Sequence, residues 1–157
     1  MLQGLTNQYV IVARDVSTDA NDNTLSILKM VDKVEIGLDH ITYDRLTKDA
    51  SFKFSPQLTF AVAASFGVKD YAEKDSDFTV RFVIVSPLGK KLVKVDQQVK
   101  LQKGTDKVRI NLNLQGMPLD SSGKYIFTAS AVDGEKVLAE GSTTLDVRLF
   151  EQQPESV

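Results

Sequence analysis

Two acidic segments contain the residues of this chain that could bind a metal ion. Asp15, Asp19 and Asp22 lie in the first predicted loop, and Asp70, Asp75 and Asp77 lie in the third. Calcium takes roughly six to eight oxygen ligands, mostly carboxylates and carbonyls, which flexible loops can supply. If the strands alternate up and down, odd-numbered loops share one end of the domain. These six aspartates are therefore candidate calcium ligands.

Local turn chemistry explains the same residues without a ligand. Asp and Asn hydrogen-bond to nearby backbone, and Gly tolerates positive φ, so all three are common in turns. The calcium-loop motif D-x-[DN]-x-[DN]-G is missing, and Lys69, Lys74, Lys103 and Lys107 dilute the negative charge. The expectation is a solvated, turn-rich end. Calcium is the one cofactor that the sequence suggests.

The irregular segment 37–56 marks a second candidate site. Connections of this length are often functional. With the Ser86–Gly89 turn and the loop 116–123, it would form the end opposite the acidic loops. The side chains that could contact a protein partner there are His40, Tyr43, Arg45, Leu46, Met117 and Leu119. The alternative is that the segment simply packs over the mouth of the fold.

The sequence lacks the residue sets of familiar catalytic mechanisms. It has one histidine, His40, and no cysteine. A Ser-His-Asp triad would have to use His40, and no G-x-S-x-G elbow, P-loop, dinucleotide fingerprint, H-E-x-x-H or zinc-ligand cluster occurs. No pair of carboxylates stands in an aromatic-rich setting, and there is no tryptophan to stack on a sugar. We therefore expect that the protein is not an enzyme.

Charge and composition limit the classes of molecule that the protein could bind. The net charge of −2 at pH 7 argues against nucleic acid, because phosphate binding needs clustered Lys and Arg. The first residues lack the charged and apolar regions of a signal peptide. The strongest apolar run, Tyr9 to Ala13, is too short to span a membrane. Together with the lack of cysteine, these features favour a cytoplasmic protein with no membrane partner.

Eight segments have the residue patterns of β-strands, the first continuously apolar and the others alternating between apolar and polar residues. They are 9–13, 24–36, 58–66, 78–84, 91–101, 108–114, 125–132 and 137–149. The apolar phase slips near 28–31, which suggests a bulge. Lysines in 91–101 suggest an edge strand, because charged residues protect exposed edges against pairing with other chains. Asp133-Gly134 predicts a hairpin turn.

This pattern predicts an all-β fold with minimal helix. The expected architecture is a single antiparallel β-sandwich of about eight strands, immunoglobulin-like or C2-like. One helical turn is expected at 41–46. The sandwich would occupy residues 1–150, followed by a short polar tail at 151–157.

Several short motifs resemble a family of small bacterial β-sandwich proteins known only as a domain of unknown function. They are Ile11-Val12-Ala13-Arg14-Asp15-Val16, Thr24-Leu25-Ser26-Ile27, Ser86-Pro87-Leu88-Gly89, and the segment from Gly123-Lys124-Tyr125-Ile126-Phe127 to Val132-Asp133-Gly134. The resemblance covers most of the chain and implies a β-sandwich. It implies no activity, and it assigns no functional residues.

The features above favour a non-enzymatic module that binds another protein or itself, in a bacterium or a phage. Loops or an exposed strand edge would make the contact. Two alternatives remain open at this point. One is a calcium- or small-ligand-binding module that uses the acidic loops, and the other is a structural subunit of a larger assembly.

Overall fold

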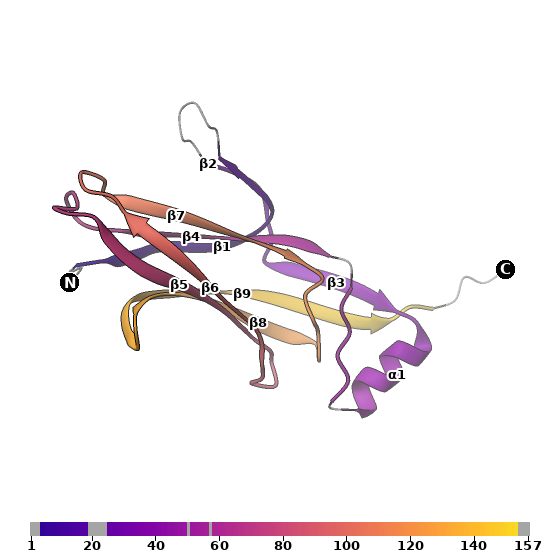
Figure 1. Cartoon of the computed structure of the whole chain (residues 1–157). Helices are drawn as coiled ribbons and strands as arrows, with labels where there is room; N and C mark the ends of the chain where they lie inside the picture. Colours follow the sequence, from indigo (N-terminus) through magenta and orange to yellow (C-terminus); the bar gives the residue numbers. More distant parts are fainter. Residues whose placement is uncertain (1–3, 19–24, 50, 57, 154–157) are drawn as a thin grey trace.

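A computed structural model describes residues 4–18, 25–49, 51–56 and 58–153. These residues form nine strands and one helix (Figure 1). In chain order the elements are β1 (Thr6–Thr18), β2 (Leu25–Met30), β3 (Lys33–Leu38), α1 (His40–Lys48), β4 (Thr59–Gly67), β5 (Ser76–Val85), β6 (Lys91–Leu101), β7 (Lys107–Gln115), β8 (Gly123–Asp133) and β9 (Lys136–Glu151). The predicted mostly-β fold is confirmed.

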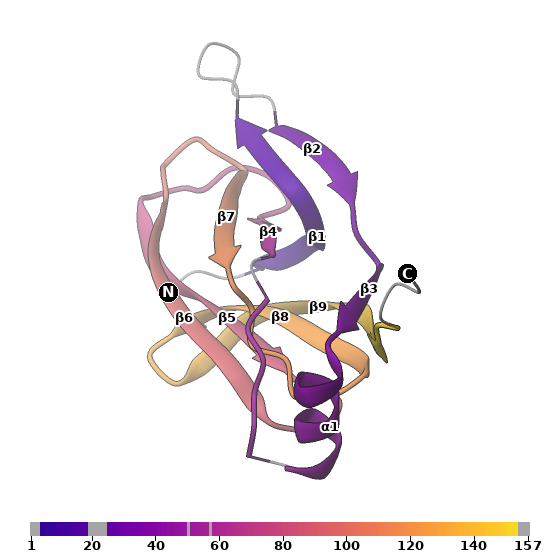
Figure 2. The same ribbon diagram turned by 90° about the vertical axis from the view of Figure 1, so that its right-hand side faces the viewer.

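The strands form two sheets. One has the strand order β2-β1-β4-β7, and the other has the order β3-β9-β8-β5-β6. Figure 2 shows the four-stranded sheet curling above the five-stranded sheet. Helix α1 lies at one end of the two sheets, near the C-terminal end of β9 (Figure 1).

The core lies between the two sheets and follows the predicted alternation. Phe78, Val80, Phe82 and Ile84 of β5 are buried, while the residues between them are half-exposed. Their partners across the core are apolar residues of β4, including the fully buried Phe60 and Phe66. Burial of such side chains contributes about 1.5–3 kcal/mol each, which is the main stabilising term of the fold.

The segment 24–36 is two strands, not the single bulged strand that the sequence predicted. Val31 N–H donates to Val12 O over 2.8 Å, which ends the pairing with β1. Asp146 N–H then donates to Asp32 O over 2.9 Å, which begins the pairing with β9. The phase slip marks the point where the chain passes from one sheet to the other.

The prediction of a wholly antiparallel fold is wrong for one strand pair. β3 runs parallel to β9, with Val34 beside Val147 and Leu38 beside Glu151. This pairing is possible because β3 enters the five-stranded sheet from the other sheet and is not joined to β9 by a hairpin, which would require antiparallel strands. Every other strand pair in the described residues is antiparallel.

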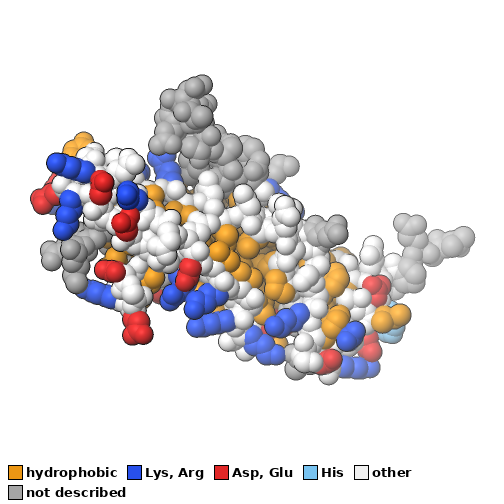
Figure 3. All heavy atoms as spheres, viewed as in Figure 1, with side chains coloured by type: hydrophobic (Ala, Val, Ile, Leu, Met, Phe, Trp, Pro, Cys, Tyr) orange, Lys and Arg blue, Asp and Glu red, His pale blue; other side chains and the backbone are white. Residues whose placement is uncertain are grey.

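The two long sides of the molecule differ. On one side the β2–β3 crossing joins the sheets, and on the other side β6 and β7 are the outer strands. The edge position predicted for β6 from its lysines is therefore confirmed. Figure 3 shows hydrophobic side chains along the seam between β6 and β7. Val93, Val95, Val108 and Leu114 are partly buried residues of these strands that pack on the core.

The β-structure continues slightly beyond the predicted boundary at residue 150. β9 ends at Glu151, and Gln152 N–H donates to Leu38 O over 2.7 Å. Only residues 154–157 of the predicted tail lie outside the described part of the chain. In that described part, no helix is long and apolar enough to cross a membrane.

Candidate functional site

A cavity of about 410 Å³ lies between α1 and two loops at one end of the sheets. Its lining residues are Tyr43, Leu46, Thr47, Lys48, Leu88, Asp120, Ser121, Ser122 and Leu149. They come from the three segments that the sequence predicted to share this end, together with the last strand. The volume is within the range of small-ligand pockets and suits one or two side chains of a partner.

Local hydrogen bonds fix the start of α1, which forms one wall of the cavity. Asp39 is the N-cap, and its carboxylate accepts from Thr42 N over 2.8 Å and from Thr42 Oγ1 over 2.9 Å. These hydrogen bonds hold the pKa of Asp39 below its usual value. The helix is longer than the single predicted turn, because the Asp39 cap satisfies a backbone N–H at its start and Tyr43 and Leu46 pack against the core.

The end of α1 and the segment after it are held by further contacts. Lys48 Nζ lies 2.8 Å from Asp44 Oδ1, one helical turn earlier. The Arg45 guanidinium lies over the Phe52 ring, 4.1 Å from its centroid. Phe54 then exchanges two backbone hydrogen bonds with Leu119, of 2.8 and 2.7 Å. These contacts attach α1 to the β7–β8 loop.

The β5–β6 turn supplies an apolar residue to the rim of the cavity. Gly89 N–H donates to Ser86 O over 2.9 Å, which closes the predicted turn, and the buried Ser86 hydroxyl accepts from Leu88 N–H. Leu88 projects from this turn and is 55% exposed. Gly123 packs so closely on Pro87 that a Cβ atom there would lie 2.9 Å from the proline ring, at a φ of +135°. Glycine is therefore needed where the two loops meet.

Tyr125 anchors the β7–β8 loop from inside the core. Its side chain is fully buried, and its hydroxyl donates to Ser121 O over 2.6 Å. The same hydroxyl oxygen accepts from the backbone N–H groups of Asp120 and Ser121, each over 3.2 Å. Burial raises the pKa of Tyr125. This hydroxyl therefore stays protonated at neutral pH and fixes the position of Asp120 and Ser121.

Asp120 is the unusual residue of the cavity. It is only 4% exposed, and its Oδ1 accepts from Ser121 Oγ over 2.9 Å. Its Oδ2 is buried without a hydrogen-bond partner among the described residues. A buried carboxylate oxygen without a partner is costly, so this atom requires an explanation.

Exposed apolar side chains surround this end of the molecule. Ile41 of α1 is 78% exposed, and Leu88 and Phe150 are also exposed. His40, the first residue of α1, lies beside Glu151 at the end of β9. This end of the molecule thus combines apolar side chains with charged ones, as protein-binding surfaces do.

The structure places the six predicted partner contacts in three different settings. Tyr43 and Leu46 line the cavity. His40 and Arg45 lie outside it, His40 with its Nδ1 2.5 Å from Glu151 Oε1 and Arg45 stacked on Phe52. Met117 and Leu119 are 2% and 1% exposed, so their prediction as surface contacts is wrong. Both side chains point from the loop back into the core, where apolar residues are required.

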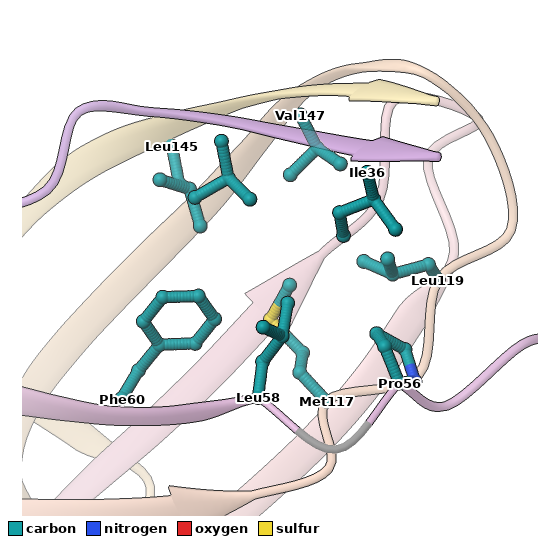
Figure 4. Close-up of a pocket in the computed structure, with 9 residues that line it drawn as sticks. Ile36, Pro56, Leu58, Phe60, Met117, Leu119, Leu145 and Val147 are labelled. Carbon is teal, nitrogen blue, oxygen red and sulfur yellow. The ribbon is translucent and has the colours of Figure 1, made fainter. Parts of the chain in front are cut away.

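Met117 and Leu119 belong to a closed apolar region beneath the cavity (Figure 4). The other side chains around this region are Val34, Ile36, Pro56, Leu58, Phe60, Leu145 and Val147. Figure 4 shows these side chains pointing toward one another from both sheets. The space between them does not admit a water molecule. This region supports the cavity but is not itself a binding site.

Sequence reasoning missed seven lining residues, which are Thr47, Lys48, Leu88, Asp120, Ser121, Ser122 and Leu149. Leu88 carried a signal, because it is an apolar residue in a short turn. Leu149 carried none, since its alternation in β9 predicted only a core position.

The predicted calcium ligands are not all at one end of the molecule. Thr6 at the start of β1 pairs with Gly67 at the end of β4, so Asp15 lies at the far end of β1 from the β4–β5 loop that contains Asp70. Asp75 Oδ1 accepts from Lys103 N–H over 2.8 Å, and Asp77 is an exposed residue of β5. Asp19 and Asp22 lie outside the described residues.

The assumption that odd-numbered loops share an end is therefore wrong for these two segments. It failed because β2 and β3 occupy different sheets, which shifts the alternation of loop ends along the chain. Within the described ranges, no group of three or more His, Asp or Glu side chains is placed to hold a metal ion.

Replacing Asp39 with alanine should loosen α1 at neutral pH. The lowered pKa of Asp39 means that its capping contribution is present above its ordinary pKa and is lost as the pH falls through the lowered folded-state value. Hydrogen exchange of the Thr42 and Tyr43 amides should therefore be faster in Asp39→Ala than in the wild type at pH 7. The difference should narrow below about pH 4.

Asp44→Ala is the matched control for this change. It removes only the exposed pair with Lys48, which contributes little to helix stability. Equal exchange in Asp39→Ala and wild type at pH 7 would show that the cap does not hold the helix.

No protein-family model and no curated protein matches the sequence, in keeping with a resemblance that assigns no activity. Solved structures share the fold at low identity. The alkylpurine DNA glycosylase AlkC of Pseudomonas fluorescens is 10% identical, with a TM-score of 0.50, and the match covers 94% of this chain and 31% of that one. A glycosyl hydrolase family 2 member from Bacteroides cellulosilyticus is 12% identical, with a TM-score of 0.49. That match covers 62% of this chain and 15% of the hydrolase.

A β-glucuronidase of Bifidobacterium dentium is 14% identical with a TM-score of 0.46, and the match covers 92% of this chain and 18% of that one. This chain thus spans less than a third of the length of these three solved proteins. At such identities the likeness concerns the fold alone.

Proposed function

We propose that this protein is a non-enzymatic interaction module, acting in the cytoplasm of a bacterium or a phage-infected cell, that docks a protein partner at the α1 end. The observation that supports this most directly is the 410 Å³ cavity between α1, the β5–β6 turn and the β7–β8 loop. Leu88 on its rim is 55% exposed, so folding alone leaves this apolar side chain largely in solvent. A partner side chain seated in the cavity would bury Leu88.

The scaffold of this module is best described as immunoglobulin-like rather than C2-like. The strands β1, β4 and β7 occupy the order of strands A, B and E, and β9, β8, β5 and β6 occupy that of G, F, C and C′. Tyr125 resembles the tyrosine corner of such domains, because it lies near the start of the F-like strand and bonds to backbone just upstream. In that scaffold, loops at the ends of the sheets commonly bind partners.

Replacing Leu88 with aspartate should abolish capture of the partner without unfolding the protein. A charge on the rim would have to be buried against the partner's apolar surface, whereas it stays in solvent in the free protein. The measurement is an affinity pull-down from the native host with quantitative mass spectrometry, alongside a thermal melt. We expect at least about a tenfold loss of the specific partner.

Val137→Asp is the matched control. Val137 is 53% exposed, close to the 55% of Leu88, but it follows the β8–β9 hairpin at the opposite end of these strands. Equal loss of the partner in both variants would contradict docking at the α1 end. Point changes are preferable to deleting 40–54, because Phe54 pairs with Leu119 and a deletion would disturb the loop itself.

A further inference from the structure

The buried carboxylate of Asp120 gives the cavity a chemical preference. Asp120 is more than nine-tenths buried, lines the cavity, and has an Oδ2 with no hydrogen-bond partner among the described residues. Its Oδ1 is already engaged by Ser121 Oγ at 2.9 Å and faces Tyr125 OH at 3.4 Å. The fold therefore satisfies one oxygen of the carboxylate and leaves the other enclosed without a hydrogen-bond partner.

We propose that the cavity receives a basic side chain of the protein partner, whose guanidinium or ammonium group pairs with the Asp120 carboxylate at the cavity wall. This inference rests on the proposed docking function and names the chemistry of the docked residue. A buried carboxylate is stable when a cation pairs with it and hydrogen-bonds to it. The described residues place no Lys, Arg or His in an ion pair with Asp120, so the partner supplies the cation.

The rest of the lining suits the same occupant. Among the described residues, Lys48 is the only basic one of the lining, and its ammonium group already pairs with Asp44 at 2.8 Å. The Ser121 hydroxyl donates to Asp120 Oδ1, so its oxygen can act as a further acceptor beside the carboxylate, and an arginine has several N–H donors to match them. Tyr43, Leu46 and Leu149 provide apolar surface along which the aliphatic stem of a long basic side chain can pack.

The cavity is also too polar for a purely apolar anchor. An inserted leucine or phenylalanine would leave the Asp120 carboxylate without a cation and would keep water from it. A polar group left in that state opposes binding. A basic residue followed or preceded by an apolar one suits both the Asp120 carboxylate and the exposed Leu88 on the rim.

The test uses small probes on the whole chain. N-acetyl-arginine methylamide and N-acetyl-lysine methylamide are titrated against the 15N-labelled protein, with N-acetyl-citrulline methylamide as the neutral isostere of arginine. We expect saturable shifts at the amides of Leu88 and 120–122 with at least one of the basic probes, and about tenfold to hundredfold weaker binding of citrulline. Comparable binding of citrulline and both basic probes, or no shift at these amides, would overturn the inference.

Asp120→Asn identifies the group responsible. Asparagine keeps an oxygen to accept from Ser121 Oγ but lacks the charge, so the preference for the basic probe over citrulline should disappear. Asp77→Asn, at an exposed aspartate of β5, is the control for the change of net charge and should keep the preference. A preference that survives in Asp120→Asn would mean that another group selects the cation, and would overturn the inference.

The same variants separate this inference from the docking function. If Asp120→Asn retains the partner in the pull-down while Leu88→Asp loses it, docking at the α1 end stands and the basic anchor is wrong. If Leu88→Asp retains the partner, the proposed docking function itself fails.

Discussion

Replacing Phe60 with alanine should lower the free energy of unfolding by about 3–5 kcal/mol, the largest effect that we expect from a single substitution. Phe60 is 1% exposed and lies in β4, where it faces side chains of the opposite sheet (Figure 4). Removing its ring costs the burial of a large apolar surface and leaves a cavity that the surrounding strands cannot fill. Urea unfolding followed by tyrosine fluorescence would measure the change.

The size of this effect depends on the neighbours of Phe60. The apolar region around it admits no water, so the space left by the ring would be lined by Leu58, Leu145 and Met117 and would stay dry. Such a cavity should bind a small apolar probe such as benzene and recover part of the lost stability, which a second unfolding curve would show.

Phe150→Ala is the matched control, because it makes the same change of residue at a more exposed position. Phe150 is 39% exposed at the end of β9, so its truncation removes less buried surface and opens no internal cavity. A similar loss of unfolding free energy in both variants would contradict the prediction that burial of Phe60 is what makes its replacement costly.

Replacing Tyr125 with phenylalanine should cost about 1–3 kcal/mol of stability, although only one oxygen atom is lost. That oxygen receives two backbone N–H groups and donates to a carbonyl, and all three would be left without this partner. The loop that carries Asp120 should loosen as well. Denaturant unfolding gives the free energy, and hydrogen exchange at the Asp120 and Ser121 amides gives the local effect.

Alkaline pH tests the same hydroxyl in another way. Burial raises the pKa of Tyr125, so its contribution is complete below the ordinary tyrosine pKa of about 10 and is lost as the pH rises through the raised folded-state value. Wild-type stability should therefore decline in alkali more steeply than that of Tyr125→Phe. Burial also raises the pKa of Tyr9, so a smaller alkaline decline should remain in the variant.

Tyr71→Phe is the control for Tyr125. Tyr71 is 69% exposed and should change neither the free energy of unfolding nor its alkaline decline. If Tyr125→Phe behaved like Tyr71→Phe, the hydrogen bonds of the corner would contribute nothing to the fold.

The sequence predicted best where a single physical rule controls a segment. Strict alternation placed Phe60 and Phe66 of β4 and the four apolar residues of β5 in the core, because successive side chains of a strand point to opposite faces. The turn at Ser86–Gly89 followed from proline and glycine chemistry. These features need no knowledge of distant partners.

The errors arose where distant partners decide. The parallel pairing of β3 with β9 joins segments from opposite ends of the chain, and nothing in Lys33–Leu38 itself specifies parallel pairing. Met117 and Leu119 read as loop residues because their burial depends on Phe60 and Leu145 across the core. Asp120 stood out only once the cavity beside it was known.

The pairing of β3 with β9 also has a consequence for the order of folding during synthesis. Contacts between residues far apart in sequence form slowly, because a long loop must close before they can contribute. β3 emerges from the ribosome early, yet its partner in the five-stranded sheet is the last of the described strands to be made.

Leu149 belongs to that strand, pairs with Ile36 and lines the cavity. Under the proposed docking function, the site is therefore complete only once translation has passed β9, and a product truncated before β9 would leave the β3 edge unpaired.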